Sequence, residues 1–208
     1  MFTRKEWPGS AFKTDPKKNH EDLVKSIADY LRSLNLKGSL TIEEAAITAS
    51  QGIKFPATQV NSSDVNTLDD YEEAATFTPT FTFATPGDKT SLNSVAVGDA
   101  TKIGRLVFAQ FAIATSSFSH TTAAGDLIIS GFPYTVSSAS SRIFRGSLSQ
   151  WRGITKAGYT QMAVAMVAGG TTANIAASGS GVASANVTAA DMPTGGTVFL
   201  FGSVEYIV

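Results

Sequence analysis

The chain has 208 residues, which is enough for one well-filled core or for a domain with an attached arm. Its 16 basic and 17 acidic residues leave a net charge of −1, so the sequence excludes the strongly basic surface typical of nucleic-acid binding. Cysteine is absent, which excludes disulfides, thiolate metal sites and a cysteine nucleophile.

The sequence shows no pattern of a secretory leader or of a membrane span. Arg4, Lys5 and Glu6 follow Met1 without an apolar run, and no segment has the roughly 20 apolar residues that a membrane helix needs. We therefore expect no membrane insertion. A chain of this kind that acts outside a bacterium is expected to leave it by lysis rather than by secretion.

Residues 1–38 are predicted to form an attachment arm with one helix over residues 19–37. Asn19 is a good N-cap, and Gly38 is a typical stop. Four apolar residues recur at helical spacing: Leu23, Ile27, Leu31 and Leu34. A helix this short is marginal alone, so we expect the stripe to pack against further copies of the chain or against a larger protein.

Three bulky aromatic residues precede this helix, namely Phe2, Trp7 and Phe12. Such residues in a terminal tail are expected to plug into a neighbouring protein. The alternative is that they fold back on the helix.

Residues 39–75 show no single hydrophobic period and are predicted to form an extended connector. Its end is acidic, with Asp64, Asp69, Asp70, Glu72 and Glu73. These carboxylates lack the spacing of a calcium loop, so a solvated connector is expected, with an ion site as the alternative.

Residues 76–208 are predicted to form an all-β domain. Apolar and polar residues alternate from Thr76 to Phe83, which places Phe77, Phe81 and Phe83 on one face of a strand and threonines on the other. Turn signals such as Pro86-Gly87-Asp88 and Gly98-Asp99 separate further strands. The strand candidates are residues 76–85, 94–97, 104–115, 126–130, 141–151, 159–168 and 197–208, with another around 175–187. This spacing is typical of a sandwich, most simply a jelly roll.

Two of these strands are apolar on both faces. They contain the runs Leu106-Val107-Phe108-Ala109 and Val198-Phe199-Leu200-Phe201. A two-layer sandwich buries one face of each sheet, so the other face must be covered by further protein. A homotrimer around a threefold axis would supply that cover.

Three stretches of the chain resemble segments of bacteriophage fibre and appendage proteins. They are FPATQ at 55–59 leading into NTLDDYEEAATFTP at 66–79, then TKIGRLV at 101–107 and ISGFP at 129–133. Ala74 and Ala75 stand where the pattern usually has a glycine. The resemblance covers roughly residues 50–135 and the last third only in general character.

The resemblance implies a virion structural protein, assembled in the host cytoplasm and extracellular in the mature particle. It implies a tail fibre or a head fibre that adheres to the host, with a connector wound around the partner chains. The arm would dock on another virion protein, tail or capsid, through Phe2, Trp7, Phe12, Leu23, Ile27, Leu31 and Leu34. The alternatives are a capsid decoration protein without a receptor role and a glycan-cleaving tail protein.

The residues do not favour an enzyme, a metal centre or a cofactor site. The chain has two histidines, too few for a histidine-rich metal site, and His120 lies in a Ser-His-Thr-Thr run that is expected to be a polar loop. No Gly-x-Ser-x-Gly elbow accompanies it. Most acidic residues of the β-region lie in glycine or proline turns, where aspartate is favoured for backbone reasons.

Glycan binding requires only an aromatic ring flanked by amide or guanidinium donors. The residues predicted to provide it are Trp151, Arg152, Tyr159 and Gln161, with Phe118 and His120 in a separate loop. The alternative is that Trp151 fills the sandwich or the subunit interface while Arg152 faces water.

Overall fold

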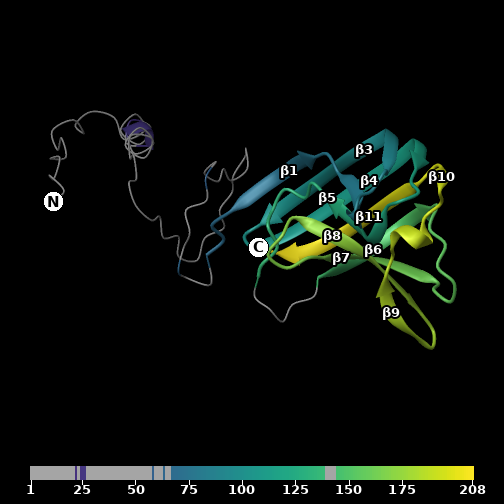
Figure 1. Cartoon of the computed structure of the whole chain (residues 1–208). Helices are drawn as coiled ribbons and strands as arrows, with labels where there is room; N and C mark the ends of the chain where they lie inside the picture. Colours follow the sequence, from purple (N-terminus) through teal and green to yellow (C-terminus); the bar gives the residue numbers. More distant parts are fainter. Residues whose placement is uncertain (1–21, 23, 27–57, 59–62, 64–66, 139–143) are drawn as a thin grey trace. The chain divides into compact units, whose positions relative to one another are not determined.

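The computed structural model describes residues 22, 24–26, 58, 63, 67–138 and 144–208 of the chain (Figure 1). The chain divides into two compact units, Met1–Ile53 and Lys54–Val208. In the first unit, Asp22, Val24, Lys25 and Ser26 are helical and exposed, inside the range of the predicted helix. The rest of that helix, the tail aromatics and most of the connector lie outside the described residues.

The second unit is mainly β, as the sequence predicts, and its strands form one curled antiparallel sheet. The strands are β1 (Tyr71–Phe77), β2 (Thr80–Thr85), β3 (Thr90–Ile103), β4 (Leu106–Ser119), β5 (Ala124–Ser130), β6 (Arg145–Arg152), β7 (Gln161–Met166), β8 (Thr172–Gly179), β9 (Val182–Asn186), β10 (Gly195–Gly196) and β11 (Phe199–Ile207). A short 3-10 helix, η1 (Ala189–Asp191), follows β9.

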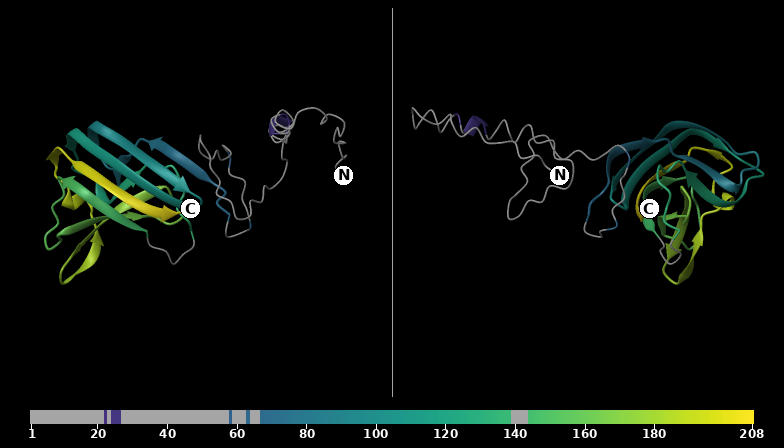
Figure 2. Two further views of the ribbon diagram at one scale, coloured as in Figure 1. Left: turned by 180° about the vertical axis from the view of Figure 1, so that it is seen from behind. Right: turned by 90° about the vertical axis from the view of Figure 1, so that its left-hand side faces the viewer.

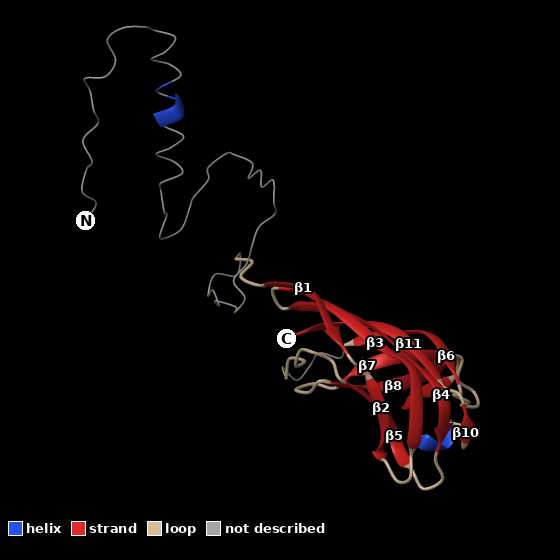
Figure 3. Ribbon diagram, turned by 90° about the horizontal axis from the view of Figure 1, so that it is seen from above, coloured by secondary structure: helices blue, strands red, loops and turns tan. Residues whose placement is uncertain are grey.

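The strand order in the sheet is β1-β3-β4-β11-β6-β7-β8-β5-β2, with β10 beside β4 and β9 beside β8. The sheet curls around a common interior (Figures 2 and 3). Its two end strands, β1 and β2, are consecutive in the chain and are separated by Thr78 and Pro79. The predicted single strand 76–85 is therefore two strands, because proline has no amide hydrogen for a ladder and ends the pairing at this point.

The core fills the inside of the curl with one face of each long strand. Phe81 and Phe83 of β2 are buried there as the alternation predicts, and Phe77 packs against the same cluster. The fully buried side chains with the largest volumes come from nearly every strand: Tyr206, Phe83, Ile113, Leu127, Ile129, Leu148, Ile175 and Leu200.

The predicted turn at Gly98-Asp99 is wrong, since both residues lie inside β3. Gly98 pairs with Phe77 across the β1–β3 ladder, and the Phe77 ring covers its α-carbon. The glycine is needed here for close packing of a ring on the backbone rather than for a turn.

The sheet also begins earlier than predicted, at Tyr71 instead of Thr76. Tyr71 pairs with Ile103 and Glu72 with Lys102, so the acidic end of the predicted connector is part of β1. The sequence pattern was misleading because Glu72 stands opposite Lys102 of β3 and Glu73 is exposed, so both carboxylates are compatible with a strand.

Candidate functional site

The side chains of β3, β4 and β11 that alternate with the core residues form an exposed surface, here called the outer face. On β4, Val107 and Ala109 are inaccessible to solvent, whereas Leu106 and Phe108 are 46% and 43% exposed. On β3, Val97 is 58% exposed. The outer face therefore presents large apolar side chains to solvent on neighbouring strands.

Cross-strand pairing gathers these side chains at the two ends of the outer face. At one end Ala112 lies between Val97 and Phe201, and the rings of Phe199 and Phe201 stack with centroids 6.0 Å apart. At the other end Leu106 pairs with both Ile103 and Ile207. These paired positions make each end a continuous apolar cluster.

A polar row separates the two clusters and forms the floor of a hollow. Gln110 pairs with Asp99 on one side and with Ser203 on the other. The hollow has a volume of about 410 Å³, and its lining includes Val97, Phe108 and Phe201 together with this row. Its shape and mixed lining are suited to a protein surface that presents both apolar and hydrogen-bonding groups.

A second hollow, of about 420 Å³, opens where β6 and β7 separate. Residues 145–147 of β6 pair with residues 163–165 of β7. Beyond this short ladder β6 pairs with β11 alone, and β7 pairs with β8 alone. Trp151 and Gln161 both line this hollow, as do Thr160, Ser147 and Ser178. The Ser178 hydroxyl lies 3.4 Å from the side-chain oxygen of Gln161 and restricts that amide.

The structure does not bring the other predicted glycan residues into this hollow. The guanidinium group of Arg152 lies over the Phe199 ring, 5.5 Å from its centroid. The Tyr159 hydroxyl donates to the carbonyl of Ala183, and Lys156 lies over the Tyr159 ring. Only part of the predicted set, Trp151 with Gln161, therefore shares a surface hollow.

The prediction that Phe118 lies in a loop is wrong, and His120 lies between β4 and β5 as predicted but is buried. Phe118 belongs to β4 and is 3% exposed, and His120 directly after it is 6% exposed. The imidazole packs against the rings of Phe83 and Phe118, with centroids 5.3 and 5.4 Å away. Both side chains are part of the core and are not available to a ligand at the surface.

Sequence reasoning missed a buried ion pair at the corner where the β-domain begins. Lys102 of β3 donates a hydrogen bond to the carboxylate of Asp70, and both residues are buried. The Lys102 ammonium also lies 5.6 Å from the centroid of the Tyr134 ring. Burial raises the pKa of Tyr134, and the charges of Glu72 and Asp70 raise it further. Asp70 was expected to be solvated because it belongs to an acidic run with Asp69, Glu72 and Glu73.

The carboxylates that the sequence places in turns are engaged by structural hydrogen bonds. Asp88 accepts from the hydroxyl and amide groups of Thr121 and Thr122, at 2.5 to 3.0 Å. Asp126 accepts from the Asn186 amide at 2.6 Å, and Asp191 accepts from Lys156 at 2.7 Å. Within the described parts of the chain, no group of three or more histidine or carboxylate side chains is placed to hold a metal ion.

The predicted attachment residues lie outside the described residues: Phe2, Trp7, Phe12, Leu23, Ile27, Leu31 and Leu34. Among the residues that the structure does describe, no helix has the length and apolar character to cross a membrane. Comparison with known proteins finds no matching family model, no similar curated protein and no similar solved structure.

Proposed function

We propose that the chain is a structural protein of a bacteriophage particle whose β-domain forms a homotrimer. In this proposal the curled sheet is a jelly-roll-like β-sandwich that closes its outer face against further copies of itself. The domain projects from the particle as part of a tail fibre or head fibre, and residues 1–38 attach it to another virion protein.

The observation that carries the proposal is the outer face. Leu106, Phe108 and Val97 are large apolar side chains, each more than two-fifths exposed. Val97 belongs to the cluster with Phe199 and Phe201, and Leu106 belongs to the cluster at the other end. Clusters of large exposed apolar side chains on a folded domain mark an interaction surface. A copy of the same chain is the partner proposed, because each copy supplies both apolar clusters and a polar row in which the Gln110 amide and the Ser203 hydroxyl can donate to the Asp99 carboxylate of another copy.

The sequence resemblance supports the phage setting, and the three resembling stretches meet in space. The amide of Gly104, in residues 101–107, donates to the carbonyl of Asp70, in residues 66–79, at 2.7 Å. The rings of Phe77 and Phe132 lie 5.4 Å apart and connect the first stretch to residues 129–133. The described parts of the three stretches thus contact one another at the two ends of β1.

Light scattering on the purified chain tests this proposal. A mass three times the 21.7 kDa of one copy is expected, and a stable monomer would contradict it. Phe108→Ser should shift the protein towards smaller species because it places a hydroxyl in the interface. Val182→Ser is the matched control, since Val182 is similarly exposed but lies on β9, away from the outer face.

A second role, adhesion to a host glycan, is favoured by the hollow between β6 and β7. Its lining combines the Trp151 ring with the amide of Gln161 and the hydroxyls of Thr160 and Ser178, and it contains no ionisable side chain. This chemistry suits stacking and hydrogen bonding to a neutral sugar rather than glycan cleavage, which needs a pair of carboxylates. Incubation with host polysaccharide is therefore expected to release no reducing ends.

Immunogold labelling of particles distinguishes the locations. Label on the tail or on projecting fibres agrees with the proposal. A uniform label over the capsid surface would favour a decoration protein instead.

A further inference from the structure

Two carboxylates flank one amine at the corner where β1 begins. The Lys102 ammonium group contacts the carboxylate of Asp70 and forms an ion pair with it. Glu72 lies directly opposite Lys102 in the β1–β3 ladder, so the two side chains leave the same face of the sheet with β-carbons roughly 5 Å apart. Asp70, Glu72 and Lys102 therefore form a compact group of three ionisable side chains.

The contact between Lys102 and Asp70 is almost free of solvent. Their side chains are 9% and 3% exposed. Val107, the other cross-strand neighbour of Lys102, is fully buried, and the Tyr134 ring lies on a further side of the ammonium group. Separated charges are costly in such surroundings. An amide bond in place of this ion pair would remove both charges.

The backbone holds the two groups in this position. The carbonyl of Asp70 accepts a hydrogen bond from the amide of Gly104, two residues beyond Lys102. Lys102 itself is paired on both sides, with Glu72 of β1 and Val107 of β4. Well-oriented groups held in contact within one molecule can reach effective concentrations of about 10⁵ M or more.

We propose that Lys102 and Asp70 form an intramolecular isopeptide bond after the domain has folded. In the proposed step one proton passes from Nζ to the Asp70 carboxylate, the lone pair freed on Nζ attacks Cγ, the Nζ–Cγ bond forms and one Cγ–O bond breaks. Glu72 takes the proton released by the nitrogen and returns it to the departing oxygen, which leaves as water. The step is a condensation that consumes no oxidant, reductant or cofactor.

The bond would connect the residue before β1 covalently to β3. This property is independent of the oligomeric state and of the location of the protein in a particle. It requires only that the corner folds as the structure describes it.

Electrospray mass spectrometry of the full-length protein, unfolded immediately before injection, tests the proposal. The mass is expected to fall short of the sequence mass by one water molecule. Tandem mass spectrometry of a protease digest should place the link between Asp70 and Lys102. A protein that stays at the sequence mass after prolonged incubation in the folded state would overturn the proposal.

Four variants assign the lost water to this pair. Lys102→Arg is expected to keep the full sequence mass, whereas Lys156→Arg, which alters a more exposed ion pair, should still lose one water. Asp70→Asn should reach the same final mass as the natural chain, because ammonia leaves in place of water. Glu72→Gln should form the bond about a hundredfold more slowly, the usual loss for a missing proton relay. If Lys102→Arg also lost water while retaining the β-rich circular dichroism spectrum of the natural chain, the dehydration would lie elsewhere and the proposal would be wrong.

Discussion

The Phe77 ring lies against the α-carbon of Gly98, so closely that a β-carbon at residue 98 would come within 2.4 Å of Cζ of the ring. The other side of the ring faces Phe132, with centroids 5.4 Å apart. Phe77 is half-buried and packs against the hydrophobic core.

Gly98→Ala is expected to destabilise the β-domain by about 1–3 kcal/mol, because the added methyl group overpacks this contact. Urea denaturation measures the loss. Gly170→Ala is the control, since the nearest atom to its new methyl group would be 3.6 Å away, and its effect should stay within about 0.5 kcal/mol. Combining Gly98→Ala with Phe77→Ala should cost less than the sum of the single changes, and strict additivity would contradict the contact.

The carboxylate of Asp88 ties the β2–β3 turn to the residues that follow β4. The hydroxyl of Thr121, then its amide and the amide of Thr122, hold the pKa of Asp88 well below its usual 3.8. A lowered pKa in the folded state means that the stabilisation is present above about pH 4 and is lost as the pH falls below that value.

Asp88→Asn should therefore lower the melting temperature at pH 6, and the difference from the natural chain should shrink as the pH falls from 4 towards 2. Melting curves over this range provide the measurement. A constant difference between Asp88→Asn and the natural chain at all pH values would contradict the prediction.

His120 is buried between two phenylalanine rings, and neither ring nitrogen has a hydrogen-bond partner among the described residues. A buried polar group without a hydrogen-bond partner loses the hydrogen bonds that water makes to it in the unfolded chain, and the folded protein does not replace them. His120→Leu should therefore raise the free energy of unfolding by about 1 kcal/mol, as measured in urea. Phe118→Ala at the neighbouring position should instead lower it by about 3 kcal/mol through the cavity it leaves. A comparable loss in His120→Leu would show that the imidazole does have a partner.

Trp151 provides an optical test of the hollow between β6 and β7. The chain has two tryptophans, so Trp7→Phe leaves Trp151 as the reporter. Titration with host polysaccharide should quench its fluorescence, since a stacked sugar changes the surroundings of the ring. Gln161→Ala should weaken this binding at least tenfold, whereas Arg152→Ala, which alters a side chain over Phe199, should change it little. Equal effects of both variants would place the ligand elsewhere.

The sequence predicts the class of the fold and one face of several strands. The alternation from Thr76 to Phe83 identifies Phe81 and Phe83 as core residues, because a strand has a period of two and needs no other information. The double apolarity of residues 106–109 likewise identifies side chains that one sheet leaves exposed, such as Phe108. These patterns depend only on residues close together in the sequence, so the folded structure does not change which face of the strand each side chain takes.

The rest depends on which distant residues become neighbours. Asp70 has a solvated sequence context, and its partner Lys102 lies 32 residues further along the chain. Gly98-Asp99 has the sequence pattern of a turn, and the reason for the glycine, the Phe77 ring that covers it, comes from another strand. His120 appears polar and exposed because the rings that enclose it come partly from β2. No short window of sequence contains these pairings.

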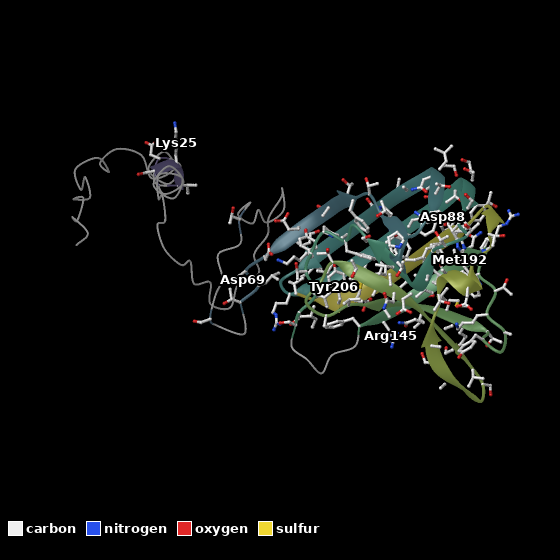
Figure 4. All side chains as sticks on the ribbon, viewed as in Figure 1. Lys25, Asp69, Asp88, Arg145, Met192 and Tyr206 are labelled. Atoms are coloured by element: carbon white, nitrogen blue, oxygen red, sulfur yellow. The ribbon has the colours of Figure 1, made fainter. Side chains whose placement is uncertain are left out.

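Both ends of the β-domain lie at the same end of the sheet, which determines where the domain can be attached to a larger assembly. The amide of Val208 donates to the carbonyl of Arg105, and Gly104 donates to Asp70, so the first and last strands meet at the β3–β4 hairpin. Asp88 lies at the opposite end of the sheet from Asp69 (Figure 4), about 40 Å away along the 14 residues of β3. An attachment through either end of the β-domain therefore holds it at the β3–β4 hairpin. The far rim is left as the natural place to insert a peptide tag or a fluorophore without disturbing whatever holds the protein.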